Sequence, residues 1–237
     1  GDPEIVVKDV LNSQDYSSPE NVAFGDPAQA IGYMASDGES LYNFNTLTGD
    51  VSRMTVNGGK LSLEKLATLD MQSFKISQDD YSYLMDIRTP VVTGGSLYFV
   101  TCDWSGSDSV YALISVDLTS GKTASIKLNR NIGALTAYKP TGSGTPSLLA
   151  YLYGDWDEQN NKSIPPEVAI LDAATGTMTT ALALGDDGMN GMTYDAASDT
   201  LFYENGDTVW ARTAFGEPQR RAYLSLNYIS SAVLAGG

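Results

Sequence analysis

The sequence predicts an all-β fold in which repeated units of antiparallel strands are arranged radially. Three observations support this prediction. A strand-and-turn pattern recurs four times, turn-forming residues interrupt the chain at short intervals, and no window has a convincing helical period. Stacked repeats of this kind bury one continuous core. The predicted architecture is therefore a β-propeller of four-stranded antiparallel blades, either with about five blades or as a fragment of a larger ring.

The recurring pattern is an alternating strand that runs into a tight turn ending in glycine. It occupies residues Ser40–Gly49, Val110–Gly121 and Val168–Gly176, and more weakly Val209–Gly216. The interval from Gly176 to Gly216 matches the roughly 40–45 residues of one four-stranded blade. The longer intervals between the earlier copies then require insertions, which the polar, Gly-rich and Pro-rich stretches of the chain supply.

Each turn has a physical reason for its first and last residue. Asp172 opens a full Asp-x-x-Thr-Gly turn and Asp117 a near copy of it, because an Asp side chain can accept backbone N–H groups within the turn. The closing glycine takes a left-handed conformation that other residues adopt at a cost. We therefore expect positive φ at Gly49, Gly121 and Gly176.

The units can be placed in order along one domain that covers residues 1–237. Recognisable blades are expected at residues 27–59, 89–130, 131–187 and 188–222. Residues 60–88 are expected to form an insertion or an irregular blade, and 223–237 a closing strand or the start of a truncated blade. Within the second unit the side chains alternate with period two: Leu97, Phe99 and Thr101 share one face, and Tyr98 and Val100 share the other.

With these repeats the chain resembles secreted bacterial β-propellers of the quinoprotein-like and surface-layer-like type, whose blades carry a strand followed by an Asp-x-x-Thr-Gly turn. Asp172–Gly176 fits that turn fully, Asp117–Gly121 has Ser120 in place of Thr, and Asn45–Gly49 has Asn in place of Asp. The resemblance implies the architecture and an extracellular or cell-surface location. It implies no activity, because no quinone-site or nicotinamide motif accompanies the repeats.

Composition limits the partners and the chemistry. The formal net charge of −15 disfavours a nucleic-acid partner, which would need clustered Lys and Arg. No apolar run approaches the about 20 residues of a membrane helix, so no membrane insertion by this segment is expected. The chain has no His and a single Cys, Cys102, which follows an apolar strand. The usual Ser-His and Cys-His nucleophile pairs are therefore excluded, and Cys102 is expected to be a small buried hydrophobe.

Acidic and aromatic residues gather in segments expected to lie on one rim. The candidate ligand-binding residues are Asp103, Trp104, Asp155, Trp156, Asp157, Asp186 and Asp187. An indole face can stack on the C–H groups of a sugar while carboxylates accept hydrogen bonds from its hydroxyl groups. The alternative is that each Trp folds back over its own blade as a hydrophobic lid. Trp104 and Trp156 are predicted to share a rim of adjacent blades.

The sequence predicts no cofactor and no catalytic residue. Residues 155–161 alternate oxygen-bearing side chains as a calcium loop would, but Asn160 replaces the required Gly and Pro166 the final Glu. The leading functional hypothesis is a non-catalytic binding or scaffold module of an exported bacterial protein, which recognises a carbohydrate or a protein partner. The alternatives are a carboxylate-dependent glycoside hydrolase or lyase, with or without calcium, and a structural spacer in a larger cell-surface protein.

Overall fold

The fold is all-β, as the sequence predicts. The computed structural model describes residues 32–45, 48–57, 60–70, 88–103, 110–138, 147–185, 188–206 and 208–223. Every helix or strand assigned in these residues is a strand, and antiparallel pairing joins the strands into four four-stranded sheets and one two-stranded hairpin. Each four-stranded sheet is one blade of the propeller.

The four blades follow one another along the chain. The first blade consists of β1 (Tyr33–Ser36), β2 (Leu41–Asn45), β3 (Asp50–Asn57) and β4 (Lys60–Thr68). The second consists of β5 (Arg88–Thr93), β6 (Ser96–Asp103), β7 (Val110–Asp117) and β8 (Thr123–Leu128). The third consists of β9 (Ile132–Tyr138), β10 (Ser147–Leu152), β13 (Glu167–Leu171) and β14 (Met178–Ala183). The fourth consists of β15 (Gly191–Asp195), β16 (Thr200–Asn205), β17 (Thr208–Thr213) and β18 (Gln219–Tyr223).

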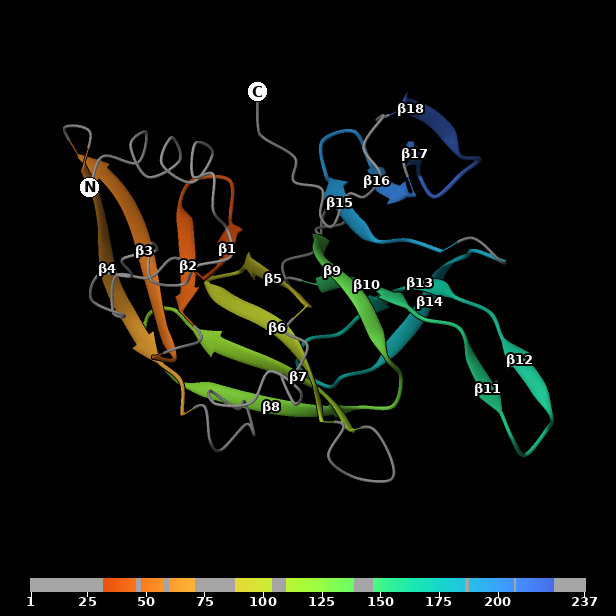
Figure 1. The fold of residues 1–237 in the computed structure, drawn as a ribbon, viewed down its shortest axis with the longest axis horizontal. Helices are drawn as coiled ribbons and strands as arrows, with labels where there is room; N and C mark the ends of the chain where they lie inside the picture. Colours follow the sequence, from red (N-terminus) through yellow and green to blue (C-terminus); the bar gives the residue numbers. More distant parts are fainter. Residues whose placement is uncertain are drawn as a thin grey trace, which may run out of the picture.

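The first strand of each blade is the innermost one. Strands β1, β5, β9 and β15 contact one another in that order, so the blades fan out from a shared inner side (Figure 1). The hairpin of β11 (Asp155–Asp157) and β12 (Lys162–Ile164) is inserted between β10 and β13 and projects from the third blade. This insertion in the third blade is therefore itself regular structure, a two-stranded hairpin.

The core lies between neighbouring blades, and strand alternation explains why. In β6, Leu97 and Phe99 pack toward the first blade, whereas Tyr98 and Val100 pack toward the third. The Phe99 ring stacks on Phe44 of β2 with their centroids 5.0 Å apart. The second and third blades are thus apolar on both faces, and each of the three interfaces between consecutive blades buries side chains from two sheets. Cys102 is buried, as expected.

The turns after β7 and β13 confirm the predicted turn chemistry. Asp117 Oδ1 accepts the backbone N–H groups of Thr119 and Ser120, at 3.1 and 2.6 Å. Asp172 Oδ1 accepts those of Ala174 and Thr175 in the same way. The glycines that close these turns, like Gly49, have positive φ values between 70° and 77°.

Two of these turn glycines, Gly121 and Gly176, lie against the preceding blade. A Cβ added to Gly121 would lie 3.6 Å from Ala67 Cβ in β4, and one added to Gly176 would lie 2.7 Å from Ile126 Cγ2 in β8. In both cases the turn between the third and fourth strands of one blade rests on the outermost strand of the preceding blade. At Gly176 the lack of a Cβ therefore serves both the turn and the interface, whereas at Gly121 a Cβ would make only ordinary contact.

The structure differs from the sequence analysis in two places in the first blade. The turn Asn45–Gly49 joins the second and third strands, whereas the turns closed by Gly121 and Gly176 join the third and fourth. It is therefore not an equivalent copy of them. Residues Lys60–Thr68, which the sequence analysis left outside the first blade, form its fourth strand and pair with β3. The described residues contain no helix long and apolar enough to span a bilayer.

Candidate functional site

The projecting hairpin carries three of the residues that the sequence singled out. Asp155, Trp156 and Asp157 form β11, and Trp156 pairs with Ser163 of β12. The turn between the two strands is closed by Asn161, which has φ 50°. Pairing of the two short strands fixes the positions of these side chains, and the hairpin stands away from the blade (Figure 1).

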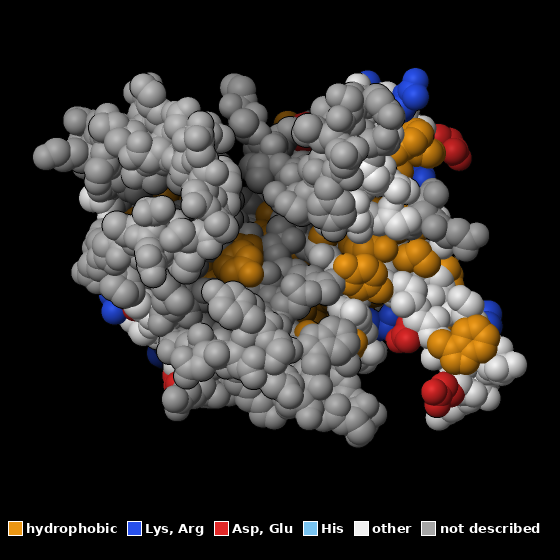
Figure 2. All heavy atoms as spheres, viewed as in Figure 1, with side chains coloured by type: hydrophobic (Ala, Val, Ile, Leu, Met, Phe, Trp, Pro, Cys, Tyr) orange, Lys and Arg blue, Asp and Glu red, His pale blue; other side chains and the backbone are white. Residues whose placement is uncertain are grey.

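Trp156 is exposed to solvent. Its exposed fraction is 54%, which is high for a large aromatic side chain. Figure 2 shows a hydrophobic patch on the projecting hairpin with an acidic side chain close to it. The structure therefore does not place Trp156 as a lid folded over its own blade, because a lid would be buried. A large exposed indole is one feature that marks interaction surfaces.

The two acids that flank Trp156 have local hydrogen-bond partners. Asp155 Oδ1 accepts the backbone N–H of Trp156 at 2.8 Å. Asp157 Oδ1 accepts the backbone N–H of Asn160 at 3.1 Å, and Asp157 Oδ2 accepts from Asn160 Nδ2 at 2.7 Å. The Asn160 side chain, and then its backbone N–H, lowers the pKa of Asp157. Asp157 therefore stabilises the hairpin turn, and Asp155 keeps Oδ2 without a partner among the described residues.

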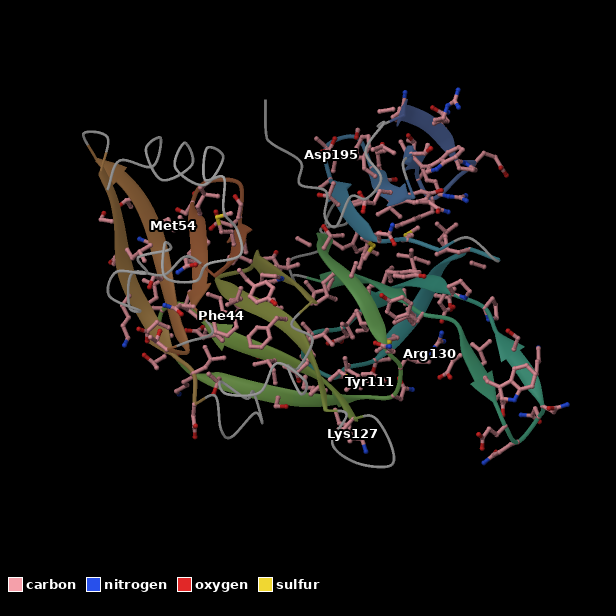
Figure 3. All side chains as sticks on the ribbon, viewed as in Figure 1. Phe44, Met54, Tyr111, Lys127, Arg130 and Asp195 are labelled. Atoms are coloured by element: carbon pink, nitrogen blue, oxygen red, sulfur yellow. The ribbon has the colours of Figure 1, made fainter. Side chains whose placement is uncertain are left out.

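The base of the hairpin is fixed by an ion pair that the sequence analysis did not identify. Arg130, in the connection between β8 and β9, lies 3.1 Å from Glu167 Oε1 and donates to the Tyr153 carbonyl oxygen at 2.8 Å (Figure 3). Glu167 Oε2 accepts from Thr180 Oγ1 at 2.7 Å. Both charged side chains are mostly buried. One cation thus joins the residues just before and just after the inserted hairpin.

The remaining predicted residues are only partly described. Asp103 is the last residue of β6, and nothing is described of its side chain. Trp104, Asp186 and Asp187 lie outside the described residues. Strand order nevertheless relates two of the segments: Asp103 ends the second strand of its blade, and the hairpin follows the second strand of the next. The prediction that Trp104 and Trp156 share a rim remains a prediction.

One acid on the same rim as the hairpin stands out by its burial. Glu204, near the end of β16, is fully buried, and neither of its carboxylate oxygens has a hydrogen-bond partner. Burial raises the pKa of Glu204 above its ordinary value, since removal from water disfavours the charged form. Within the described residues no group of three or more His, Cys, Asp or Glu side chains could hold a metal ion.

Comparisons with known proteins give structural likeness only. No family model and no curated protein matches the chain. Among solved structures, it is similar to the extracellular domain of a proposed hybrid two-component system from B. thetaiotaomicron, with 14% identity and a TM-score of 0.43 over 85% of this chain and 24% of that one.

Two further structures are similar over a comparable share of the chain. A gluconolactonase from Xanthomonas campestris has 10% identity and a TM-score of 0.47 over 81% of this chain and 61% of that one. YjhT has 10% identity and a TM-score of 0.49, with coverage of 82% and 65%. The chain thus spans less than two thirds of each of these three proteins, and likeness at this level carries no statement about activity.

Proposed function

We propose that this propeller is a non-catalytic recognition module of an exported bacterial protein and that the β11–β12 hairpin contacts a glycan. The observation that carries the proposal is the 54% exposed Trp156 between two carboxylates on an anchored hairpin. The indole face would stack on the C–H groups of a sugar ring. The free oxygen of Asp155 would accept a hydroxyl hydrogen bond.

The anchoring of the hairpin supports recognition by a preformed surface. Asp157 accepts two hydrogen bonds within the turn, and Arg130 joins Tyr153, just before the hairpin, to Glu167, just after it. A ligand that binds such a hairpin does not have to order it first, which lowers the entropic cost of association. The hydrolase alternative is favoured by no comparable observation in the described residues.

The proposal is tested by comparing the wild-type chain with Trp156→Ala on a glycan array and against soluble oligosaccharides. We expect the variant to lose binding with an unchanged thermal midpoint, because an exposed side chain contributes little to stability. Met34→Ala, which removes an equally exposed apolar side chain from the first blade, is the matched control and should bind normally. Glycan binding that survives Trp156→Ala would refute the proposal. If the wild-type chain binds no glycan but binds a protein partner through Trp156, the hairpin is assigned to protein recognition instead.

A further inference from the structure

Three aromatic side chains meet at the opposite rim, where the third and fourth blades adjoin. Tyr138 is the last residue of β9, Tyr194 lies near the end of β15, and Phe215 lies in the turn between β17 and β18. Figure 1 shows β9 and β15 ending side by side on the same rim, and the two strands are in contact. The Tyr194 backbone N–H donates to Thr136 Oγ1 at 3.3 Å, which ties the two blades together here.

The three rings pack against one another at the edge of the core between the third and fourth blades. The Tyr138 and Tyr194 rings meet edge to face, with centroids 4.9 Å apart and planes at 63°. Phe215 lies 6.2 Å from Tyr138 at 53° and 6.4 Å from Tyr194 at 10°. All three side chains are only half-buried, so each ring keeps surface that a ligand can reach. A compact rounded group can contact the exposed parts of these rings, whereas a flat sugar ring needs one open face.

The backbone that presents Phe215 is strained. Ala214 and Phe215 have φ values of 48° and 54°, and the N–H of Gly216 donates to the Thr213 carbonyl oxygen at 2.9 Å. Two adjacent positive φ values define a type I′ turn, which Asn and Gly normally occupy. A bulky residue such as Phe in this conformation is an outlier, and such strain gathers at functional sites.

An acidic residue with positive φ, Asp199, completes the cluster. Asp199, in the turn between β15 and β16 that begins at the labelled Asp195 (Figure 3), has φ 50° and accepts the Tyr194 hydroxyl at 2.6 Å. Its backbone carbonyl accepts the N–H of Ala214 at 2.7 Å, so it also fixes the strained turn. The negative charge of Asp199 acts on the tyrosines, since burial together with Asp199 raises the pKa of Tyr194 and of Tyr138.

Asp199 makes no ion pair with a described cation. Arg212, in the same sheet, donates to the Tyr203 hydroxyl and the Gly216 carbonyl oxygen and lies over the Tyr203 ring at 5.9 Å. The charge of Asp199 is therefore free to act on a ligand, in a chain whose net charge of −15 already attracts cations.

We propose that Tyr138, Tyr194, Phe215 and Asp199 bind an organic cation of the quaternary or methylated ammonium class. The rings would contact the methyl groups through their negative faces, and the Asp199 carboxylate would balance the charge. A methylated ammonium suits this surface better than a primary amine, because it has fewer N–H donors to satisfy and less tightly held water. The site is separate from the hairpin, so the inference does not depend on the proposed glycan recognition.

The test is calorimetric titration of the full chain with choline chloride and with its neutral carbon isostere, 3,3-dimethylbutan-1-ol, at matched ionic strength. We expect choline to bind and the isostere to bind at least about five-fold more weakly, because the isostere lacks the charge. Asp199→Asn should weaken choline binding by a similar factor while it keeps an acceptor for the Tyr194 hydroxyl. Phe215→Leu should also weaken it, whereas the conservative Phe215→Tyr should retain it.

Trp156→Leu is the matched aromatic control and should bind choline as the wild type does, whatever its effect on glycans. Equal affinity for choline and the isostere would overturn the inference and leave only an apolar contact. Unchanged binding by both Asp199→Asn and Phe215→Leu would also overturn it, as would the absence of choline binding. A folding defect in Phe215→Leu would show in its thermal melt, and the decision would then rest on Asp199→Asn and the isostere.

Discussion

At the residue scale, the turn at Ala214 and Phe215 carries a conformational cost that can be relieved. A left-handed conformation costs an ordinary residue roughly 1 kcal/mol, and Asn tolerates it better than Ala. We expect Ala214→Asn to raise the free energy of unfolding by about 0.5 kcal/mol. Equilibrium denaturation in urea measures the change.

Ala174→Asn is the matched control for that variant. Ala174 is also an exposed turn residue, but its φ is not positive, so Asn relieves no strain there. The explanation by backbone strain fails if both substitutions change stability equally.

The turns of the fourth blade show where local sequence signals mislead. The dipeptide Asn205-Gly206 predicts a type I′ turn centred on these two positions. In the structure Asn205 belongs to β16 and pairs with Thr208, and only Gly206 of the two has positive φ. Ala214 and Phe215 are adjacent and both have positive φ, which no turn propensity of these residue types indicates. Contacts of Phe215 with Tyr138 and Tyr194, from other strands, hold that turn.

At the element scale, the inserted hairpin depends on Arg130. Removal of this side chain leaves Glu167 mostly buried without its cation. We expect Arg130→Met to lower the free energy of unfolding by on the order of 2 kcal/mol, between the values for exposed and fully buried pairs. Amide hydrogen exchange should also become faster in β11 and β12, because the strand ends are released.

Arg53→Met provides the comparison, since the Arg53–Glu64 pair is longer, at 3.5 Å, and largely exposed. It should change stability by no more than about 0.5 kcal/mol and leave exchange in the hairpin unaltered. If Arg53→Met lowers the free energy of unfolding as much as Arg130→Met does, burial of the ion pair does not explain the effect of Arg130→Met.

Sequence reasoning located the candidate hairpin but not its support. The residues around Trp156 combine an aromatic with acids, and this local composition is visible without a structure. Arg130 precedes them by more than twenty residues and Glu167 follows them, and nothing in the chain marks the two as partners. Tertiary pairs of this kind arise from how the blade folds back on itself, which a local pattern does not encode.

At the scale of the whole molecule, Ala substitutions at three turn glycines distinguish two losses of stability. One comes from backbone strain in the turn, and the other comes from overpacking between blades. Gly95, Gly121 and Gly176 have φ of 76°, 70° and 73°, so Ala at each position pays the same backbone strain of about 1 kcal/mol. A Cβ at Gly95 meets nothing within 4 Å, whereas at Gly176 it lies 2.7 Å from Ile126. We expect Gly176→Ala to cost a further 1–3 kcal/mol or so by overpacking.

Equilibrium denaturation of the three Ala variants measures this difference. Gly121→Ala should resemble Gly95→Ala, because its added Cβ would make only ordinary contact with Ala67 at 3.6 Å. Three equal losses would mean that the blade interface does not require the absence of a Cβ at Gly176.

The architecture was predictable because the repeat appears at several levels at once. Period-two alternation predicts the two faces of β6, and the Asp-to-Gly turns predict where β7 and β13 end. The first blade was harder to place: Asn45–Gly49 has the composition of the later turns but joins a different pair of strands. Composition specifies a turn, whereas the position of that turn in a blade depends on which strands pair.

The contact between a turn and the preceding blade always involves a strand that comes earlier in the sequence. Gly121 rests on a strand that precedes it in the sequence, and Gly176 does the same one blade later. During synthesis the supporting strand leaves the ribosome before the turn that needs it. Each new blade can therefore dock on a finished template, and the propeller can grow stepwise while translation continues.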